Sequence, residues 1–396
     1  MRRIPLLSLA VLGTAALALT ACAPTTTDGG GGGGDATPVA VSMIYSESGP
    51  LAAYGAAYRA GFEAGLDYAT DGTDTAGGHP LEITWSDDAG DADKAVGLAK
   101  DAIGSGSQII AGTVSSGIAL QLAEQAAQNK ILYISGPAAA DAITGVNQYT
   151  FRSGRQTYQD VATAGTFVGD PAGKSVLVFA QDTAFGQGNA AAVEAVLGGA
   201  GATVSSVLVP EDATEFTPFA QQVIDAQPDL VFVAWAGATS GAMWQALSQQ
   251  GVFDAAPVVT GLGDVSTYGA YGEASGDISF LSHYFAGATD NAVNQAMIDS
   301  LDAAGATPDL FSPDGFNAAL MIVHAVEEAA GDVDGMIAAL EGWTFDGPKG
   351  SMTIRAEDHA LLQPMFQAKL VADGDSWTPE LVETVDADTV APPVAG

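Results

Sequence analysis

Apolar runs alternate with amphipathic segments along most of the chain after residue 38. Short apolar runs predict strands at 39–46, 81–86, 108–114 and 131–135. The segments between them carry apolar residues about three or four positions apart, as Phe62 and Leu66 do, and predict helices at 51–69, 91–103 and 118–128. Strands that alternate with helices pair in parallel, so this order predicts a parallel sheet with helices on both faces.

The same alternation starts again after a short extended piece at 149–152. It predicts strands at 175–180, 203–209, 230–236 and 258–262, and helices at 184–197, 216–226 and 240–249. The strand at 175–180 is almost wholly apolar, as expected when helices cover both faces of a sheet. The pattern therefore predicts an α/β fold with two doubly wound parallel-sheet lobes.

The last part of the chain has a different pattern. It predicts helices at 291–304, 314–330 and 333–340, followed by short strands at 351–355, 365–371 and 381–385. We expect the helices to return to the first lobe and the strands to cross back to the second, which gives a three-stranded hinge. The crossings are expected near Gln156, His283 and Gly350, so that lobe 1 is 39–156 with 285–349 and lobe 2 is 157–284 with 350–396.

The N-terminus has the features of an export signal. Arg2 and Arg3 precede an apolar run from Leu6 to Leu19 that is too short to span a bilayer comfortably. The sequence Leu19-Thr20-Ala21-Cys22 that follows resembles a bacterial lipobox, which implies a signal peptide at 1–21 and lipidation of Cys22. The Gly-rich stretch at 22–38 is typical of a flexible tether. We therefore expect an extracytoplasmic protein that is anchored to the cell membrane.

Composition excludes several classes of function. The chain has 12 Lys and Arg residues against 47 Asp and Glu residues, a net charge of −35, which disfavours nucleic acid as a partner. Cys22 is the only cysteine, so no intramolecular disulfide can form. The four histidines lack metal-ligand spacing, and we expect neither a metal nor a cofactor. The chain also lacks G-x-S-x-G, P-loop and H-E-x-x-H motifs, so we do not expect an enzyme.

Candidate binding residues follow the predicted strands, because two open α/β lobes bind ligands where the carboxyl ends of their strands face each other. Hydroxyl groups at a predicted helix N-terminus favour an anion such as a carboxylate, although the same residues also fit simple helix capping. Aromatic residues after strands of the second lobe fit either a ligand clamp or core packing. Asp264, which follows the last of these strands, fits either a partner for a ligand ammonium group or an ordinary residue of a solvated loop. These candidates are Tyr54, Ser115, Ser116, the turn Ala138-Ala139-Ala140, Phe185, Trp235 and Asp264.

Beyond these loops, the chain from residue 39 resembles the type I periplasmic solute-binding proteins of the branched-chain amino acid class, which are receptors of ABC importers. The matching stretches are SGPLAAYG (48–55), WSDDAGD (85–91), AGTVSSG (111–117), ISGPAAADAIT (134–144), TFRSGRQTYQD (150–160), VFAQDTAFGQG (178–188), DGFNAALMIVHAVEEA (314–329) and FDGPKGSMTIR (345–355).

The resemblance implies roles for the candidates. Ser116 fits a serine that holds the ligand carboxylate, and a threonine position falls at Ala139 or Ala140, which lack a hydroxyl. Arg155 can replace that lost contact, because a guanidinium binds a carboxylate bidentately. Tyr54 and Phe185 fit aromatic positions of the cleft, and Trp235 lies one position from another. Asp264 is the acid nearest the position that binds the ligand ammonium.

The expected function follows from this resemblance. We expect a binding lipoprotein that captures a small amino acid, branched-chain, aliphatic or aromatic, between its lobes and delivers it to an ABC permease and its ATPase. Aromatic carboxylates or amides are the alternative ligands. A sensing module that reports a ligand to a membrane kinase is the alternative role.

Overall fold

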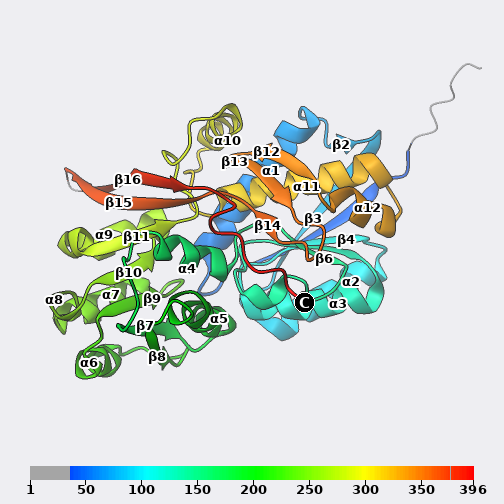
Figure 1. The fold of residues 1–396 in the computed structure, drawn as a ribbon. Helices are drawn as coiled ribbons and strands as arrows, with labels where there is room; N and C mark the ends of the chain where they lie inside the picture. Colours follow the sequence, from blue (N-terminus) through cyan, green and yellow to red (C-terminus); the bar gives the residue numbers. More distant parts are fainter. Residues whose placement is uncertain (1–35, 375) are drawn as a thin grey trace, which may run out of the picture. The chain divides into compact units, whose positions relative to one another are not determined.

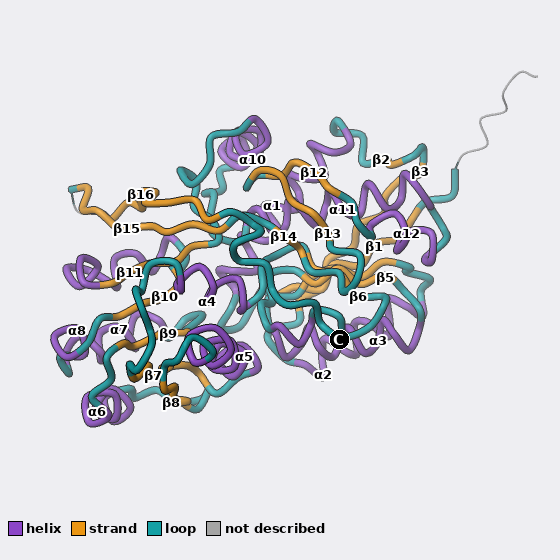
Figure 2. The backbone as a smooth tube through the Cα atoms, viewed as in Figure 1, coloured by secondary structure: helices purple, strands orange, loops and turns teal. Residues whose placement is uncertain are grey.

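The computed structural model describes residues 36–374 and 376–396. The predicted signal peptide, Cys22 and almost all of the predicted tether lie outside the described residues. Figures 1 and 2 show two groups of strands with helices around them. Among the residues described, no helix is long and apolar enough to cross a membrane.

The first lobe contains a sheet with the strand order β2-β3-β1-β4-β5-β6. All neighbours pair in parallel except β2 and β3, which form a hairpin. The strands are β1 (Val39–Tyr45), β2 (Thr75–Ala76), β3 (His79–Asp87), β4 (Ile109–Gly112), β5 (Leu132–Ser135) and β6 (Thr150–Arg152).

Alternate side chains of these strands enter two separate cores. Val41 and Met43 of β1 pack with helices α1 and α11, whereas Ile44 packs with α2 and α3. Each face of the sheet is therefore covered, as the sequence pattern predicts. The helices of this lobe are α1 (Ala52–Thr70), α2 (Ala92–Gly104), α3 (Ser116–Asn129), α10 (Ala292–Ala303), α11 (Ser312–Ala329) and α12 (Val333–Leu340).

The second lobe contains a sheet with the order β16-β15-β11-β10-β9-β7-β8. Strands β7 to β11 pair in parallel, and β15 and β16 complete the sheet in antiparallel orientation. The strands are β7 (Ser175–Gln181), β8 (Thr203–Val209), β9 (Leu230–Ala234), β10 (Val258–Gly261), β11 (Ile278–Ser282), β15 (Met365–Asp373) and β16 (Ser376–Val385).

Helices also cover both faces of this second sheet. One core contains side chains of α6 to α9, and the other contains side chains of α4 and α5. The helices are α4 (Thr157–Gly165), α5 (Ala184–Val193), α6 (Thr217–Ala226), α7 (Ser240–Gln249), α8 (Val252–Ala255) and α9 (Tyr268–Tyr271). The predicted fold of two α/β lobes is confirmed, although both sheets are mixed rather than wholly parallel, because hairpins add antiparallel strands at their edges.

The third crossing between the lobes differs from the expected position near Gly350. A small sheet of β12 (Thr344–Gly347), β13 (Gly350–Ile354) and β14 (Leu361–Leu362) precedes the crossing. Met352, Ile354 and Leu361 are buried in the core of the first lobe. These apolar side chains hold the chain there until residue 363, so the strands that join the second lobe begin at β15.

The C-terminal tail after β16 makes a further connection between the lobes. Val385 and Val390 pack against Met365 at the edge of the second lobe. Arg355 of the first lobe then donates a hydrogen bond of 2.7 Å to the carbonyl of Pro392. Figure 1 shows this tail in red as it passes from the β15–β16 hairpin to the end of the chain. The sequence pattern did not predict this connection.

Candidate ligand-binding site

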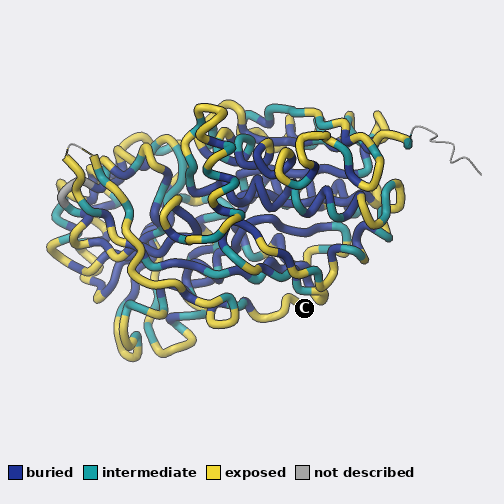
Figure 3. The backbone as a smooth tube through the Cα atoms, turned by 90° about the horizontal axis from the view of Figure 1, so that it is seen from above, coloured by how far each residue is buried: buried dark blue, intermediate teal, exposed yellow. Residues whose placement is uncertain are grey.

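A cavity of about 210 Å³ lies between the carboxyl ends of the two sheets. Its walls come from the loops after β1, β4 and β5 of the first lobe and after β7, β9 and β10 of the second. This is where two open α/β lobes are expected to bind a ligand. Figure 3 shows that the buried backbone, in dark blue, runs through the interior of the molecule and that exposed backbone, in yellow, lies mostly along its outside.

Hydrogen bonds join the two lobes beside the cavity. The Ala238 amide donates to the carbonyl of Pro50 at 3.0 Å, and the Gly237 amide donates to the hydroxyl of Tyr54 at 3.3 Å. The Val265 amide donates to the carboxylate of Asp309 at 3.2 Å. These contacts require the lobes to be close together, so the structure is in a closed arrangement.

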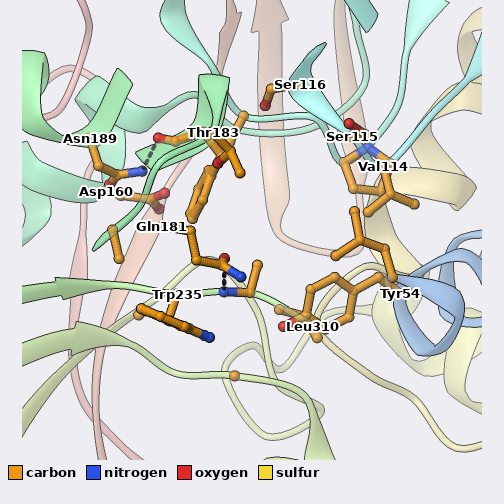
Figure 4. Close-up of a pocket in the computed structure, with 18 of the residues that line it drawn as sticks. Tyr54, Val114, Ser115, Ser116, Asp160, Gln181, Thr183, Asn189, Trp235 and Leu310 are labelled. Carbon is orange, nitrogen blue, oxygen red and sulfur yellow. Dashed lines mark hydrogen bonds between the residues drawn. The ribbon is translucent and has the colours of Figure 1, made fainter. Parts of the chain in front are cut away.

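The polar part of the first-lobe wall is the N-terminus of α3. Ser115 is the N-cap residue, but its side chain makes no capping hydrogen bond. The Ser116 hydroxyl accepts the Ala140 amide at 3.2 Å, which leaves its own proton for a ligand. Both serines line the cavity, as Figure 4 shows. Free hydroxyl groups beside a helix N-terminus suit an anion.

A buried network supports the loop that leads into α3. Asp88 accepts hydrogen bonds from the hydroxyl of Ser46 and the amide of Gly90, both at 2.8 Å, and from the hydroxyl of Thr113. Asp88 follows β3, whereas Ser46 and Thr113 follow β1 and β4. The network therefore fixes the ends of neighbouring strands relative to one another, and with them the position of Ser115.

Arg155 brings a buried cation to the cavity. Its side chain is 7% exposed, and its Nη1 donates to the carbonyl of Pro137 at 3.0 Å. Its guanidinium carbon lies 5.5 Å from the ring centroid of Phe311, within the range of a cation–π contact. The predicted position of Arg155 at the site thus agrees with the cavity lining.

Asp160, which the sequence reasoning missed, lies beside Arg155. Its Oδ2 is 3.2 Å from the Nε of Arg155, and its side chain lines the cavity. Burial raises the pKa of this carboxyl, while the charge of Arg155 opposes the rise. Figure 4 shows Asp160 together with Asn189 and Thr183 at one end of the cavity.

The second-lobe wall combines aromatic and amide side chains. Phe185 and Trp235 both line the cavity, as predicted. Trp235 also stacks on Phe179 at a centroid distance of 5.6 Å, so this residue both lines the cavity and packs in the core of the second lobe. Gln181, which was not predicted, accepts the Ala236 amide at 3.1 Å and presents its side chain to the cavity, as Figure 4 shows.

Some of the remaining candidate residues line the cavity, and others do not. Tyr54 and Ala139 line the cavity, whereas Ala138, Ala140 and Asp264 do not. Ala138 and Ala140 are buried in the first lobe, and their carbonyls accept hydrogen bonds from Arg152.

The expectation that Asp264 meets a ligand ammonium is not met by its geometry. Its carboxylate accepts the amide of Ser266 at 3.0 Å and the Ser266 hydroxyl. Asp264 thus caps the short turn that follows β10 through its Oδ1.

Other ionisable groups lie near Arg155. Burial raises the pKa of Asp314 to about 7, and neither carboxyl oxygen has a hydrogen-bond partner. Burial lowers the pKa of Lys349 to about 7, and its ammonium donates to Gln363 at 2.8 Å. Burial also lowers the pKa of His283, which lines the cavity, well below its usual value, so this imidazole is neutral at pH 7.

Comparisons with known proteins agree with this architecture. The profile of a family described as periplasmic binding protein matches residues 38–375. The Leu/Ile/Val-binding protein BraC3 of Rhizobium johnstonii is 23% identical over 309 residues, which are 76% of this chain and 83% of that protein.

Solved structures are also similar. An ABC-type branched-chain amino acid transporter protein from Rhodopseudomonas palustris is 32% identical, with a TM-score of 0.75, and the match covers 90% of this chain and 99% of that one. A solute-binding protein of an ABC transporter from R. palustris, solved in complex with 4-hydroxybenzoate, has a TM-score of 0.81 at 22% identity, over 88% of this chain and 97% of that one. The second likeness is one of fold.

Proposed function

This chain belongs to the periplasmic binding protein family, type I, of the branched-chain amino acid transporter class, and from that premise we propose that it captures a small amino acid and delivers it to an ABC permease. Proteins of this class bind solutes for ABC transporters outside the cytoplasm and are not enzymes. We further propose that lipidation at Cys22 anchors the protein to the cell membrane, with residues 22–38 as its tether.

The observation that carries the proposal is the closed interlobe cavity with one anion-binding wall and one apolar wall. The α3 N-terminus, with the hydroxyls of Ser115 and Ser116, offers donors to a carboxylate. Phe185 and Trp235 of the second lobe and Tyr54 of the first add aromatic surface to the cavity. The cavity of about 210 Å³ is smaller than the roughly 300–1,000 Å³ typical of sites for drug-sized ligands, which favours a solute of amino-acid size.

An aromatic carboxylate is the second candidate ligand. It is favoured by Arg155, which supplies a guanidinium to a cavity that already has aromatic walls. The R. palustris protein bound to 4-hydroxybenzoate has the same fold.

Capture works through closure of the two lobes. An open state exposes the α3 N-terminus, and the ligand then bridges to Phe185, Trp235 and Gln181 of the second lobe. Closure also forms the hydrogen bonds from Gly237 and Ala238 to the first lobe. The ligand shifts the equilibrium only through contacts that it makes in the closed state. The permease then recognises the closed surface.

A thermal-shift screen of residues 36–396 tests the proposal. The panel holds all amino acids, aromatic acids, short amides, polyamines and sugars, and the protein is unfolded and refolded first to remove bound ligand. A ligand at 100 times its dissociation constant adds about 2.7 kcal/mol of stability. We expect a shift with branched-chain, aliphatic or aromatic amino acids. A shift with aromatic acids alone would select the second candidate, and no shift with any compound would contradict the importer role.

A further inference from the structure

We propose that Asp160 selects zwitterionic ligands, accepting the ligand's ammonium group while Arg155 and the α3 N-terminus hold its carboxylate. The inference rests on the proposed function, because it names the class of ligand that the same cavity takes. Asp160 stands in the first turn of α4, directly after the first crossing between the lobes. Its side chain lines the cavity and is 5% exposed.

The pairing of Asp160 leaves its oxygens available to a ligand. Within the described residues, Arg155 is the only hydrogen-bond donor to this carboxylate, through Nε at 3.4 Å from Oδ1 and 3.2 Å from Oδ2. These distances are longer than the roughly 2.7–2.9 Å of a strong charge-assisted hydrogen bond. An ammonium group in the cavity can therefore bind Asp160 without breaking a tight ion pair.

The charges around Arg155 and Asp160 are balanced. Arg152 donates to carbonyl groups of the first lobe, and Asp141 is the opposite charge that acts most strongly on it. Asp314 interacts with Arg155 and Lys349 as opposite charges, and His283 is neutral at pH 7. The Arg155 guanidinium has Asp160 in direct contact and Asp314 as a further opposite charge. The cavity thus contains no cation without a counter-charge among the residues described.

This balance decides which ligands can enter. A lone carboxylate beside Arg155 would neutralise the charge of that guanidinium. It would leave Asp160 as a buried anion with only the weaker effect of Lys349 to offset it, which is unfavourable. An amino acid supplies its own ammonium group and keeps the cavity neutral. An acid without an amine binds only when Asp160 takes up a proton, so its affinity falls as the pH rises.

Glu211 provides a matched comparison. It also lines the cavity, but it is exposed on the loop after β8, where water screens its charge. If any acid beside the cavity were enough to favour amino acids over deaminated acids, Glu211 would have the same effect as Asp160. The proposal requires that the buried acid alone has this effect.

The test compares ligands that differ only in the amine. We would measure affinities of the full mature chain for leucine and 4-methylpentanoate, and for phenylalanine and 3-phenylpropanoate, by calorimetry at pH 6 and pH 8. Runs in two buffers of different ionisation enthalpy give the number of protons taken up. The same measurements on Asp160→Asn and Glu211→Gln complete the set.

We expect the wild type to bind an amino acid roughly thirtyfold or more tightly than its deaminated partner at pH 8, because an unpaired buried charge is costly. The deaminated acid should bind with uptake of about one proton, as linkage requires. Asp160→Asn should lose that preference and that uptake, whereas Glu211→Gln should keep both.

Distinct results would overturn the inference. Deaminated acids that bind the wild type as tightly as amino acids, without proton uptake, would refute it while leaving a solute-binding function intact. Proton uptake that persists in Asp160→Asn would assign the proton to Lys349 or Asp314 instead. Binding of a deaminated acid by the wild type without proton uptake refutes the inference and needs no variant, so the test stands even if Asp160→Asn fails to fold. Binding of none of these compounds, amino acids included, would overturn the proposed function itself.

Discussion

Asp314 offers a direct test of how the protein tolerates a buried charge. This residue lies in the first turn of α11, is fully buried, and has no hydrogen-bond partner for either carboxyl oxygen. The exchange Asp314→Asn keeps the shape of the side chain and removes its charge. We expect the variant to be at least as stable as the wild type near neutral pH and to have a flatter dependence of stability on pH.

The size of the effect follows from the shifted pKa. Burial raises the pKa of Asp314 to about 7 in the folded chain, against 3.8 in the unfolded one. Since the folded state binds the proton more tightly, this group adds stability at pH 5 and loses it as the pH rises toward 7. Between pH 5 and pH 6.5 its contribution falls by about 2 kcal/mol. Lys349 stays largely protonated over this range because its pKa is also about 7.

The assay is urea unfolding at both pH values, followed by tryptophan fluorescence and by circular dichroism. Fluorescence and circular dichroism should change together, as expected for a two-state transition. Asp309→Asn is the matched control, because burial raises the pKa of Asp309 only to about 6 and its carboxylate accepts backbone amides. If Asp314→Asn retains the full fall in unfolding free energy, or is equally destabilised at both pH values, the reasoning is refuted.

Further predictions concern binding and packing. Arg155→Gln should weaken binding of a carboxylate ligand roughly thirtyfold or more by calorimetry, whereas Arg59→Gln, at a partly exposed arginine that does not line the cavity, should not. Gly315→Ala should cost about 1–3 kcal/mol in thermal unfolding, because the new Cβ would lie 1.9 Å from the carbonyl oxygen of Tyr58, whereas Gly97→Ala meets no atom within 4 Å and should not destabilise. Asp358→Ala should cost roughly 3 kcal/mol or more, because it leaves Arg355 unpaired, and hydrogen exchange at 391–396 should rise.

Much of the fold could be predicted because the repeating elements of each lobe have clear hydrophobic periods. The strands β1 and β7 and the helices α3 and α7 agree with the predicted ranges to within two residues. Helix α4 was not predicted, because its first turn carries polar residues that are buried at the junction of the lobes rather than an apolar stripe. The position of the third crossing depends on tertiary packing of β13 and β14, which the local pattern does not reveal.

The site could be predicted where a residue's role is set by its own strand or helix. Ser115 and Ser116 follow directly from a strand–turn–helix pattern, and Arg155 was found because arginines are few. Asp160, Gln181 and Asn189 reach the cavity through the arrangement of lobes and helices. Asp264 is the opposite case, because its local turn uses the carboxylate that its position in the chain suggested for a ligand. The sequence did contain a signal for this turn: Asp264 is followed two positions later by Ser266, a spacing at which an aspartate side chain accepts a hydrogen bond from the backbone.

The location of the charged groups links binding to closure. Arg155 precedes α4 on the first crossing, and His283 lies on the second crossing, between β11 and the first-lobe side chain Tyr284. Both line the cavity, so a ligand contacts the segments that must change direction when the lobes rotate. Contacts to such segments differ between open and closed states, and only this difference shifts the equilibrium. A ligand that satisfies Arg155 and Asp160 together therefore stabilises the closed hinge directly, in addition to bridging the two walls.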